Sequence, residues 1–246
     1  YPNIINSTAS MKYTTGLTIR KGLNFNGAYS VRDRSEVGCI IFRAVEAYLN
    51  YMESCYEKTG ILDVDAKKYW KAIRDRSKIG DYNITIENTD MNKERETDWG
   101  AYSAGKLVDK TLFNIRRERR CELMAEGFRY ADIRRWRAMD QMIDTPYHIL
   151  GMNLWDEMAE NEDFLESNED GLQEGKNVSP KSFSKYLAPY HIFANNHAYD
   201  GYRWNMAHYL DPIAIQHFLI TGAGDISASP LYQNPGWPLQ AGQGAQ

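Results

Sequence analysis

A predicted helix in the middle of the chain carries charged side chains on the face that should be buried. Spacings of three and four residues place Arg119, Glu122 and Glu126 on the same stripe as Leu112 and Ile115. Buried charges are costly unless they are paired, and removing one partner costs about 3–5 kcal/mol. Such a stripe fits either a catalytic or anion-binding site, or a lattice of ion pairs that fastens the helix to its neighbours.

We favour the lattice because arginines are interleaved with the acids. Glu118, Glu122 and Glu126 repeat every four residues, a spacing that repels mildly unless cations lie between them. The cations available in the same stretch are Arg116, Arg117, Arg119, Arg120, Arg129, Arg134, Arg135 and Arg137. We therefore expect Arg119→Ala or Glu122→Ala to lower stability and to leave ligand chemistry intact, because each leaves a buried partner unpaired.

The element that positions these charges is predicted to be a helix over 111–126. This run contains neither Gly nor Pro, Asp109 is a suitable N-cap, and Gly127 is a suitable left-handed residue to end it. A second helix should follow and continue until Pro146. Its apolar positions are Trp136, Met139 and Ile143.

Two earlier helices should pack as an antiparallel hairpin over residues 36–80. The first is expected to begin at Glu36 and to end at Gly60, and its apolar residues recur at spacings of four and three: Ile41, Val45, Tyr48, Met52 and Cys55. The second should be capped by Asp63 and carries the apolar residues Ala66, Tyr69, Trp70 and Ile73. Trp70 therefore belongs to the core of the hairpin rather than to a ligand site.

The stretch 112–136 resembles the arginine-rich signature of the SusD/RagB family of surface nutrient-binding lipoproteins. The matching residues are Arg116-Arg-Glu-Arg-Arg120, Glu122-Leu123, Glu126-Gly127, Arg129 and Asp132-Ile-Arg-Arg-Trp136. Residues 42–53 and 69–76 resemble the tetratricopeptide-like hairpin of the same family, and 209–237 resembles the way its members end. The resemblance runs from about residue 29 to residue 237.

The resemblance implies a mainly α fold, with a tetratricopeptide-like hairpin, carboxy-terminal helices and long loops. It also implies that residues 1–246 form the carboxy-terminal portion of a longer protein, whose signal peptide and lipid anchor lie upstream. Within this portion we expect four segments. They are an extended lead-in over 1–35, the hairpin over 36–80, the arginine-signature helices over 109–144, and a loop-rich cap and tail over 145–246.

Composition excludes some classes of protein. The net charge of −4 and pI near 5.8 argue against a nucleic-acid binder. No apolar run approaches the roughly 18 residues that a membrane span needs. Cys39, Cys55 and Cys121 are too far apart for a metal motif or an evident disulfide framework, so buried free thiols are expected.

Three short motifs are present, and none of them is specific enough to carry function. Gly100–Lys106 nearly spells a phosphate-binding loop, but Leu107 stands where the loop needs Ser or Thr. In the acidic run, Glu166–Asn177 approaches the calcium-loop pattern but lacks its final Glu, so a solvated loop is expected. Asn6-Ser7-Thr8 fits a glycosylation sequon, which is too short a motif to decide anything.

Residues 186–209 are dense in aromatic side chains. His191, His197 and His208 lie among them without a metal-ligand spacing. We expect no metal, cofactor or catalytic residue in this protein.

The resemblance implies non-catalytic binding of a nutrient, most often an oligosaccharide and sometimes a peptide, at the bacterial outer-membrane surface. It also implies a partner, a SusC-like TonB-dependent transporter, and attachment to the membrane only through the upstream lipid anchor. Aromatic rings in loops can stack on sugars while neighbouring polar groups bind hydroxyls. The candidate ligand-binding residues are therefore Trp99, Tyr102, Trp155, Tyr202 and Trp204.

Two other functions fit the sequence less well. A helical scaffold that binds only proteins would show no affinity for glycans or peptides. A glycosidase would need two carboxylates facing each other across a cleft, and nothing in the sequence places a pair there.

Trp204 has an alternative, structural role, in which it holds the long 145–205 segment against the body of the protein. The affinity and the melting temperature of a single Trp204→Ala protein distinguish this role from ligand binding.

Overall fold

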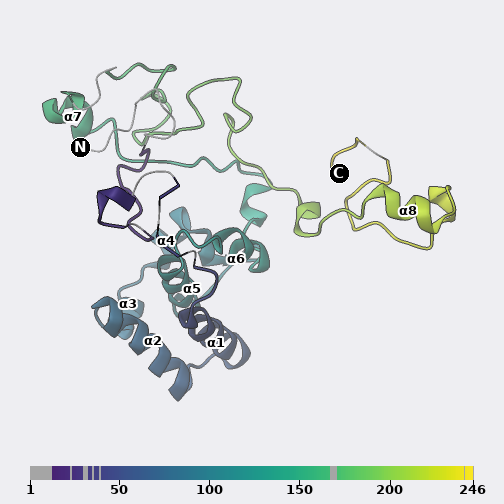
Figure 1. Ribbon diagram of the computed structural model, residues 1–246, viewed down its shortest axis with the longest axis horizontal. Coiled ribbons are helices and arrows are strands. Elements are labelled where there is room, and N and C mark those ends of the chain that lie inside the picture. The colour runs from purple at the N-terminus through teal and green to yellow at the C-terminus, as the bar shows by residue number, and fades with distance from the viewer. Residues whose placement is uncertain are drawn as a thin grey trace. The chain divides into compact units, whose positions relative to one another are not determined.

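The computed structural model describes residues 13–22, 24–29, 33–34, 36–38, 40–166, 171–240 and 242–245. These residues contain eight α-helices and one two-stranded sheet, which confirms the mainly α fold class (Figure 1). They form two compact units. Unit 1 combines the described residues 13–20 with 142–205, and unit 2 combines 21–141 with 206–246. The sequon, Cys39 and residues 167–170 of the calcium-loop pattern lie outside the described residues.

The first two helices of unit 2 are α1 (Ala44–Thr59) and α2 (Val64–Ser77), which pack against each other. Gly60, with φ of 71°, ends α1, and the Asp63 side chain accepts the Ala66 N–H at 2.8 Å at the start of α2. The expected start at Glu36 is wrong, because Arg43 is still extended. Ile41, predicted on the apolar face of α1, is therefore exposed before the helix.

The core of unit 2 lies where α1 and α2 meet the next long helix. Leu49, Met52 and Trp70 are completely buried there. The Trp70 ring stacks on Tyr82, with centroids 4.5 Å apart and planes 9° from parallel. Trp70 is therefore a core residue, as predicted.

Residues 81–108, read from the sequence as irregular, contain short elements. They are α3 (Tyr82–Glu87), α4 (Met91–Thr97), a 3-10 helix (Trp99–Ala101), β1 (Tyr102–Ser103) and β2 (Lys106–Leu107). The two α-helices are too short for an apolar period, and their only sequence signal is an N-cap aspartate, Asp81 and Asp90. The segment Gly100–Lys106, which resembles a phosphate-binding loop in sequence, contributes to the hairpin of β1 and β2. Gly105 lies in the turn of this hairpin with φ of 75°.

The central helix, α5, spans Lys110–Glu122 and is capped by Asp109 as predicted. Its predicted end at Glu126 is wrong. The backbone carbonyl of Glu122 accepts hydrogen bonds from Lys21 Nζ at 2.8 Å and from Arg43 Nη2 at 2.7 Å, and that of Met124 accepts from Lys21 at 2.8 Å. These cations bind the carbonyls that a longer helix would use, and they also favour a helix carboxyl end electrostatically.

Ion pairs hold α5 to its neighbours. Arg43 binds Glu122 at 2.7 Å and Glu126 at 2.6 Å, Arg74 of α2 binds Glu118 at 2.7 Å, and Arg119 binds Asp132 at 2.7 Å. The side chains of Glu118, Arg119, Glu122 and Glu126 are all at most 10% exposed. The predicted lattice, and the burial of its members, are confirmed.

The second signature helix, α6, is short and spans Arg129–Arg135. It stops because Arg137 takes a left-handed conformation, with φ of 51°, so the predicted continuation to Pro146 is wrong. Trp136 is buried, and its indole N–H donates to Glu53 of α1.

The free thiols were expected to be buried, but Cys121 is exposed and Cys55 is only half-buried.

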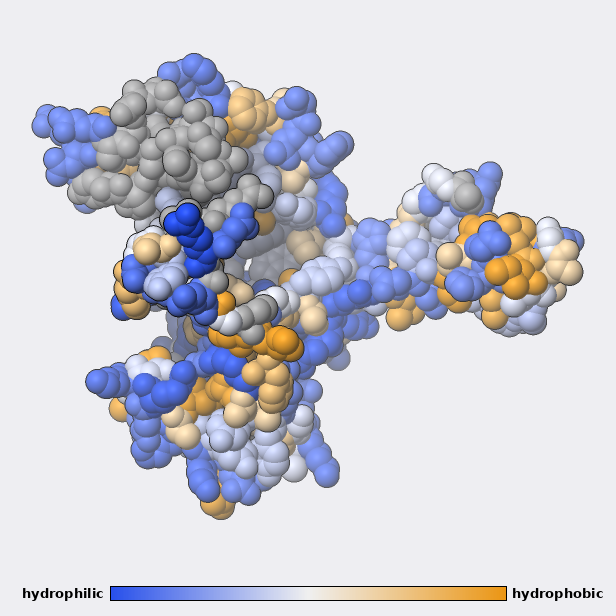
Figure 2. Space-filling model, in the orientation of Figure 1, coloured by the Kyte–Doolittle hydropathy of each residue, from blue (hydrophilic) through white to orange (hydrophobic). Residues whose placement is uncertain are grey.

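The last part of unit 2 is mostly loop. Its helices are a 3-10 helix (Met206–Tyr209), α8 (Ile215–Thr221) and a second 3-10 turn (Ile226–Ala228). Figure 2 shows apolar side chains gathered on the surface around α8, where Ile220 is exposed. None of the helices within the described ranges is long and apolar enough to span a membrane.

Unit 1 is held together by loops around a small core. Its described residues include a 3-10 helix (Glu157–Glu160) and one short α-helix, α7 (Glu162–Glu166). The buried residues of that core are Leu154, Phe164, Val178 and Leu187. Residues 13–20 join it through Thr14, whose carbonyl accepts the Met152 N–H at 3.0 Å. Glycine is required at 151, because an added Cβ there would lie 2.1 Å from the Thr14 carbonyl oxygen.

We predict that Arg119→Ala destabilises the protein by about 3 kcal/mol, the lower end of the cost of breaking a buried pair, because the buried Asp132 loses Arg119 and keeps only the more exposed Arg135. Lys71→Ala is the control. It removes an ion pair with Asp75, four residues along α2, in which both side chains are largely exposed, so the loss should be under about 0.5 kcal/mol. Chemical denaturation measures both, and equal losses would contradict the prediction.

We also predict that acid weakens the lattice at Glu126. Burial opposes ionisation of this carboxyl, but Arg43 and Lys21 outweigh it and hold its pKa below the ordinary value of 4.5. The charged form therefore stabilises the folded state above that value, and this contribution is lost as the pH falls through the lowered pKa.

A Glu126→Gln variant tests the pH dependence. It should be less stable than the parent protein near neutral pH, and the difference should shrink as the pH falls below about 4. Denaturation curves at several pH values measure the difference in the free energy of unfolding between the two proteins. A difference that stays constant down to the lowest pH would contradict the prediction that Glu126 titrates in this range.

Candidate functional site

Aromatic side chains gather in one part of unit 1, where four rings contact one another and two tyrosines, which lie close to members of that group along the chain, contact each other. We call this group the ring cluster. Its members are His148, Phe183, Tyr190, His191, Tyr199 and Tyr202. All six come from loops, so the cluster depends on how the backbone of unit 1 brings these loops together.

A three-ring stack forms the centre of the ring cluster. The His191 ring lies between Phe183, at a centroid distance of 3.7 Å, and Tyr199, at 4.0 Å, with planes within 20° of parallel. His191 Nδ1 lies 2.7 Å from the Tyr199 carbonyl oxygen, which fixes the ring orientation. His148 packs with its edge against Phe183 at 4.9 Å. Because both faces of His191 are covered, this histidine positions its neighbours and does not offer a face to a ligand.

Tyr190 and Tyr202 form an edge-to-face pair beside the stack, with centroids 5.8 Å apart and planes at 83°. Each is 40% exposed, so part of each ring remains open to a ligand. Partial burial, followed by the influence of Tyr190, raises the pKa of Tyr202 above its ordinary value. The Tyr202 hydroxyl therefore stays protonated at neutral pH and can donate a hydrogen bond.

The backbone around Gly201 sets the position of Tyr202. Tyr202 and Tyr147 exchange two backbone hydrogen bonds, of 2.8 and 2.9 Å, in an isolated antiparallel bridge. Gly201 has φ of 83°, and a Cβ added there would lie 2.9 Å from Pro146 Cβ and 3.0 Å from His148 Nε2. Glycine thus allows the close approach that places Tyr202 beside the stack.

The ring cluster has the chemistry of a binding surface. Exposed ring faces bind the C–H faces of sugars, and phenol hydroxyls at ring edges bind sugar hydroxyls. Phe183 is also exposed, at the outer end of the stack. Within the described ranges, no three His, Cys, Asp or Glu side chains are grouped so that they could hold a metal ion.

The sequence-predicted site residues lie in both units. Tyr202 belongs to the ring cluster. Trp155 packs beside the core of unit 1, and its indole N–H donates to the Ser179 carbonyl at 3.1 Å. Trp204 is half-buried in the same unit. Nothing observed tests ligand binding by these residues, so the assignments stay predictions.

The other two predicted residues belong to unit 2. Trp99 is half-buried in its 3-10 helix, and Tyr102 lies in β1, where its carbonyl accepts a hydrogen bond from Arg116. Sequence reasoning missed five ring-cluster members as site residues: His148, Phe183, Tyr190, His191 and Tyr199. The density of aromatic residues in 186–209 covered three of them but not His148 or Phe183, and it did not show which rings would touch.

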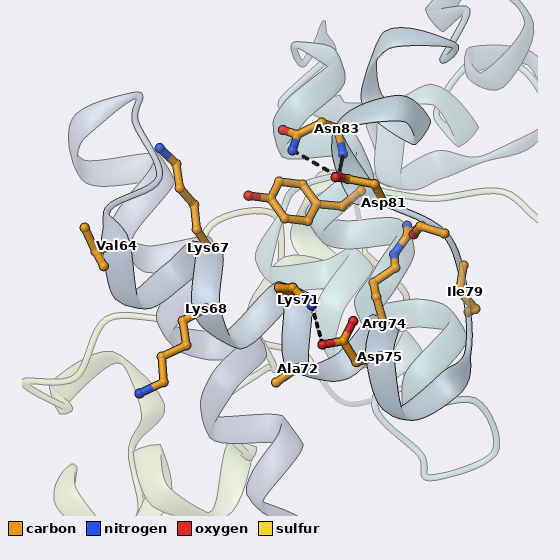
Figure 3. A pocket seen from close by; sticks show the side chains of 12 residues that line it. Val64, Lys67, Lys68, Lys71, Ala72, Arg74, Asp75, Ile79, Asp81 and Asn83 are labelled. Atoms are coloured by element: carbon orange, nitrogen blue, oxygen red, sulfur yellow. Dashed lines mark hydrogen bonds and ion pairs between the residues drawn. The ribbon is translucent and has the colours of Figure 1, made fainter.

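A cavity of about 710 Å³ lies in unit 2 between α2 and α3 (Figure 3). Lys67 and Lys68 extend from α2 in different directions, while Lys71 turns to Asp75 at 2.5 Å. Tyr82, the only aromatic ring in its lining, is stacked on Trp70. This cavity therefore suits a sugar less well than the ring cluster does.

Comparison with known proteins gives one match. The model of the SusD family matches residues 5–237, nearly the whole chain, and confirms the resemblance carried by the arginine signature. Neither the comparison with curated proteins nor the one with solved structures gave a match.

We predict that Gly201→Ala destabilises unit 1 and weakens any binding by the ring cluster. The added methyl group meets Pro146 and His148 at a backbone conformation that alanine rarely adopts, so the loss should exceed about 1 kcal/mol. Gly175→Ala is a matched control in the same unit, with φ of 73° and no atom within 4 Å of the added Cβ. The stability that Gly175→Ala loses should come from backbone strain alone and should be smaller than the loss in Gly201→Ala. Thermal melts that show the larger loss in Gly175→Ala would contradict the prediction.

Proposed function

Because the chain belongs to the SusD family, we propose that it captures an oligosaccharide at the bacterial outer-membrane surface without altering it chemically. Proteins of this family generally bind glycans or other nutrients at the cell surface and work with SusC-like transporters. In this proposal the chain delivers its ligand to a SusC-like TonB-dependent transporter. The proposal includes attachment of the protein to the membrane through a lipid anchor.

The observation that carries the proposal is the exposed part of the ring cluster. Tyr190 and Tyr202 present open ring surface and phenol hydroxyls, and Phe183, which contacts His191 and His148, is 37% exposed. The rings are held before any ligand arrives, because His191 is sandwiched and Gly201 fixes the adjoining backbone. A preorganised surface loses little side-chain entropy on binding, which favours affinity for a polar ligand.

An oligosaccharide suits this surface better than a peptide does. The six rings carry no carboxylate, ammonium or guanidinium group, and the exposed charges nearest to Tyr202 in the sequence, Asp200 and Arg203, are of opposite sign, so they give no net charge to attract a charged peptide. Planar rings beside hydroxyls are complementary to a ligand that has C–H faces and many hydroxyl groups. Peptide binding is the second candidate, because the family takes nutrients of more than one class.

We predict that Tyr202→Ala and Tyr190→Ala each weaken glycan binding by roughly 3- to 10-fold, the equivalent of about 0.5–1.5 kcal/mol per ring contact. Stability should fall by no more than about 1.5 kcal/mol, the value of the one edge-to-face contact that each variant removes, because both rings are otherwise substantially exposed. Calorimetry against a panel of oligosaccharides measures affinity, and thermal melts of the same proteins measure stability.

The matched control is Tyr232→Ala, which removes a tyrosine of unit 2 that is 90% exposed and should leave affinity unchanged. Equal losses in all three variants, or none in the two ring-cluster variants, would remove the ring cluster from the proposal. A panel that includes peptides separates the alternatives. Binding of peptides alone would favour the peptide-binding function, turnover of a glycan would indicate an enzyme, and binding of neither would favour a scaffold.

A further inference from the structure

A second cavity in unit 2 lies at the corner between α5 and α6. Its volume of about 610 Å³ falls within the range of small-molecule sites. One continuous stretch of the chain, from Arg119 to Asp132, supplies all of its lining. The residues are Arg119, Arg120, Cys121, Leu123, Met124, Ala125, Gly127, Phe128, Arg129, Tyr130 and Asp132. We call it the corner cavity.

Apolar side chains make up most of this lining. Leu123 is buried and Phe128 half-buried, and both belong to the core formed by α1, α2 and α5. Met124 and Tyr130 are 54% and 56% exposed, so they lie where the corner cavity opens to solvent. A ligand entering between Met124 and Tyr130 would therefore reach an apolar surface continuous with the core.

The same cavity carries an excess of positive charge. Arg120 and Arg129 both bind one carboxylate, Asp98, at 2.7 and 2.8 Å, so a single negative charge faces two guanidinium groups. Arg119 is paired with Asp132 at 2.7 Å, and those two charges cancel. A guanidinium carries several N–H donors, so the contact with Asp98 does not exhaust either arginine. Both side chains are also more than a third exposed, which leaves them accessible from the cavity.

We propose that the corner cavity binds a small organic anion with an apolar body, of the class of aromatic or medium-chain carboxylates and sulfonates. The apolar body lies against Met124, Phe128 and Tyr130, and the anionic group lies beside Arg120 and Arg129. A neutral ligand would leave the excess positive charge uncompensated, and a cation would be repelled by it. The site is in unit 2, apart from the ring cluster of unit 1, so it does not depend on the proposed binding of glycans.

The first test uses the dye anilinonaphthalene sulfonate, an aromatic sulfonate, as the probe. Titration of the folded chain should give a saturable rise in fluorescence. N-phenyl-1-naphthylamine, which has the same rings and no sulfonate, should bind at least about 10-fold more weakly. Equal affinities of the two dyes would overturn the proposal, because the arginines would then contribute nothing.

A variant that introduces a negative charge locates the dye. Met124→Glu places a carboxylate at the mouth of the corner cavity and should weaken dye binding at least about 10-fold. Met206→Glu makes the same change at an exposed methionine of unit 2 outside the cavity and should leave binding unaltered. Unchanged binding by Met124→Glu, or equal loss in both variants, would show that the dye binds elsewhere. Far-UV circular dichroism confirms that both variants fold.

Cys121 supplies an independent readout, because it lines the corner cavity and is exposed. Saturating dye should slow its modification by N-ethylmaleimide, with half of the effect at the dye concentration that gives half of the fluorescence change. Cys55 of α1 lies outside the cavity lining and should react at an unchanged rate, as peptide mass spectrometry can show. Equal slowing of both thiols, or of neither, would contradict binding in this cavity.

Discussion

The buried ion pairs of α5 are the interaction on which unit 2 depends. Arg43 reaches from the residue before α1 to two carboxylates and to the carbonyl end of α5, so it holds α1 and α5 in register. Buried charges tolerate little displacement, since a lost partner leaves a charge without solvation. The neighbouring Trp136 ring has the guanidiniums of Arg116 and Arg135 within 5 Å of its centroid. Charge and ring packing thus fix the same group of helices.

Unit 1 is stabilised by other interactions than the buried ion pairs of unit 2. It has little helix and few buried residues, and it is held by ring stacking and by backbone turns at positions that only glycine can occupy without strain, such as Gly151 and Gly201. Loops of this kind can present many side chains on one surface, which suits recognition of a ligand. The helical lattice supplies rigidity in unit 2, and the loops of unit 1 supply the exposed rings.

The sequence by itself determined several helix caps, which residues share a buried helix face, and the family. Asp109 and Asp63 cap helices because their side chains accept N–H groups a few residues away, an interaction that depends only on local spacing. The burial of Trp70 and the pairing of the charged stripe followed from helical periodicity, which decides what shares a face. The arginine signature identified the SusD family, because its residues are ordered along one continuous stretch.

Only the tertiary structure decided where α5 ends and which rings meet. The end at Glu122 depends on Lys21 and Arg43, which are far away in the sequence and therefore invisible to any local pattern. The ring cluster joins residues from separate loops, and no periodicity relates Phe183, His191 and Tyr199. Long-range contacts of this kind arise when folding brings distant segments together, and spacing along the chain cannot encode them.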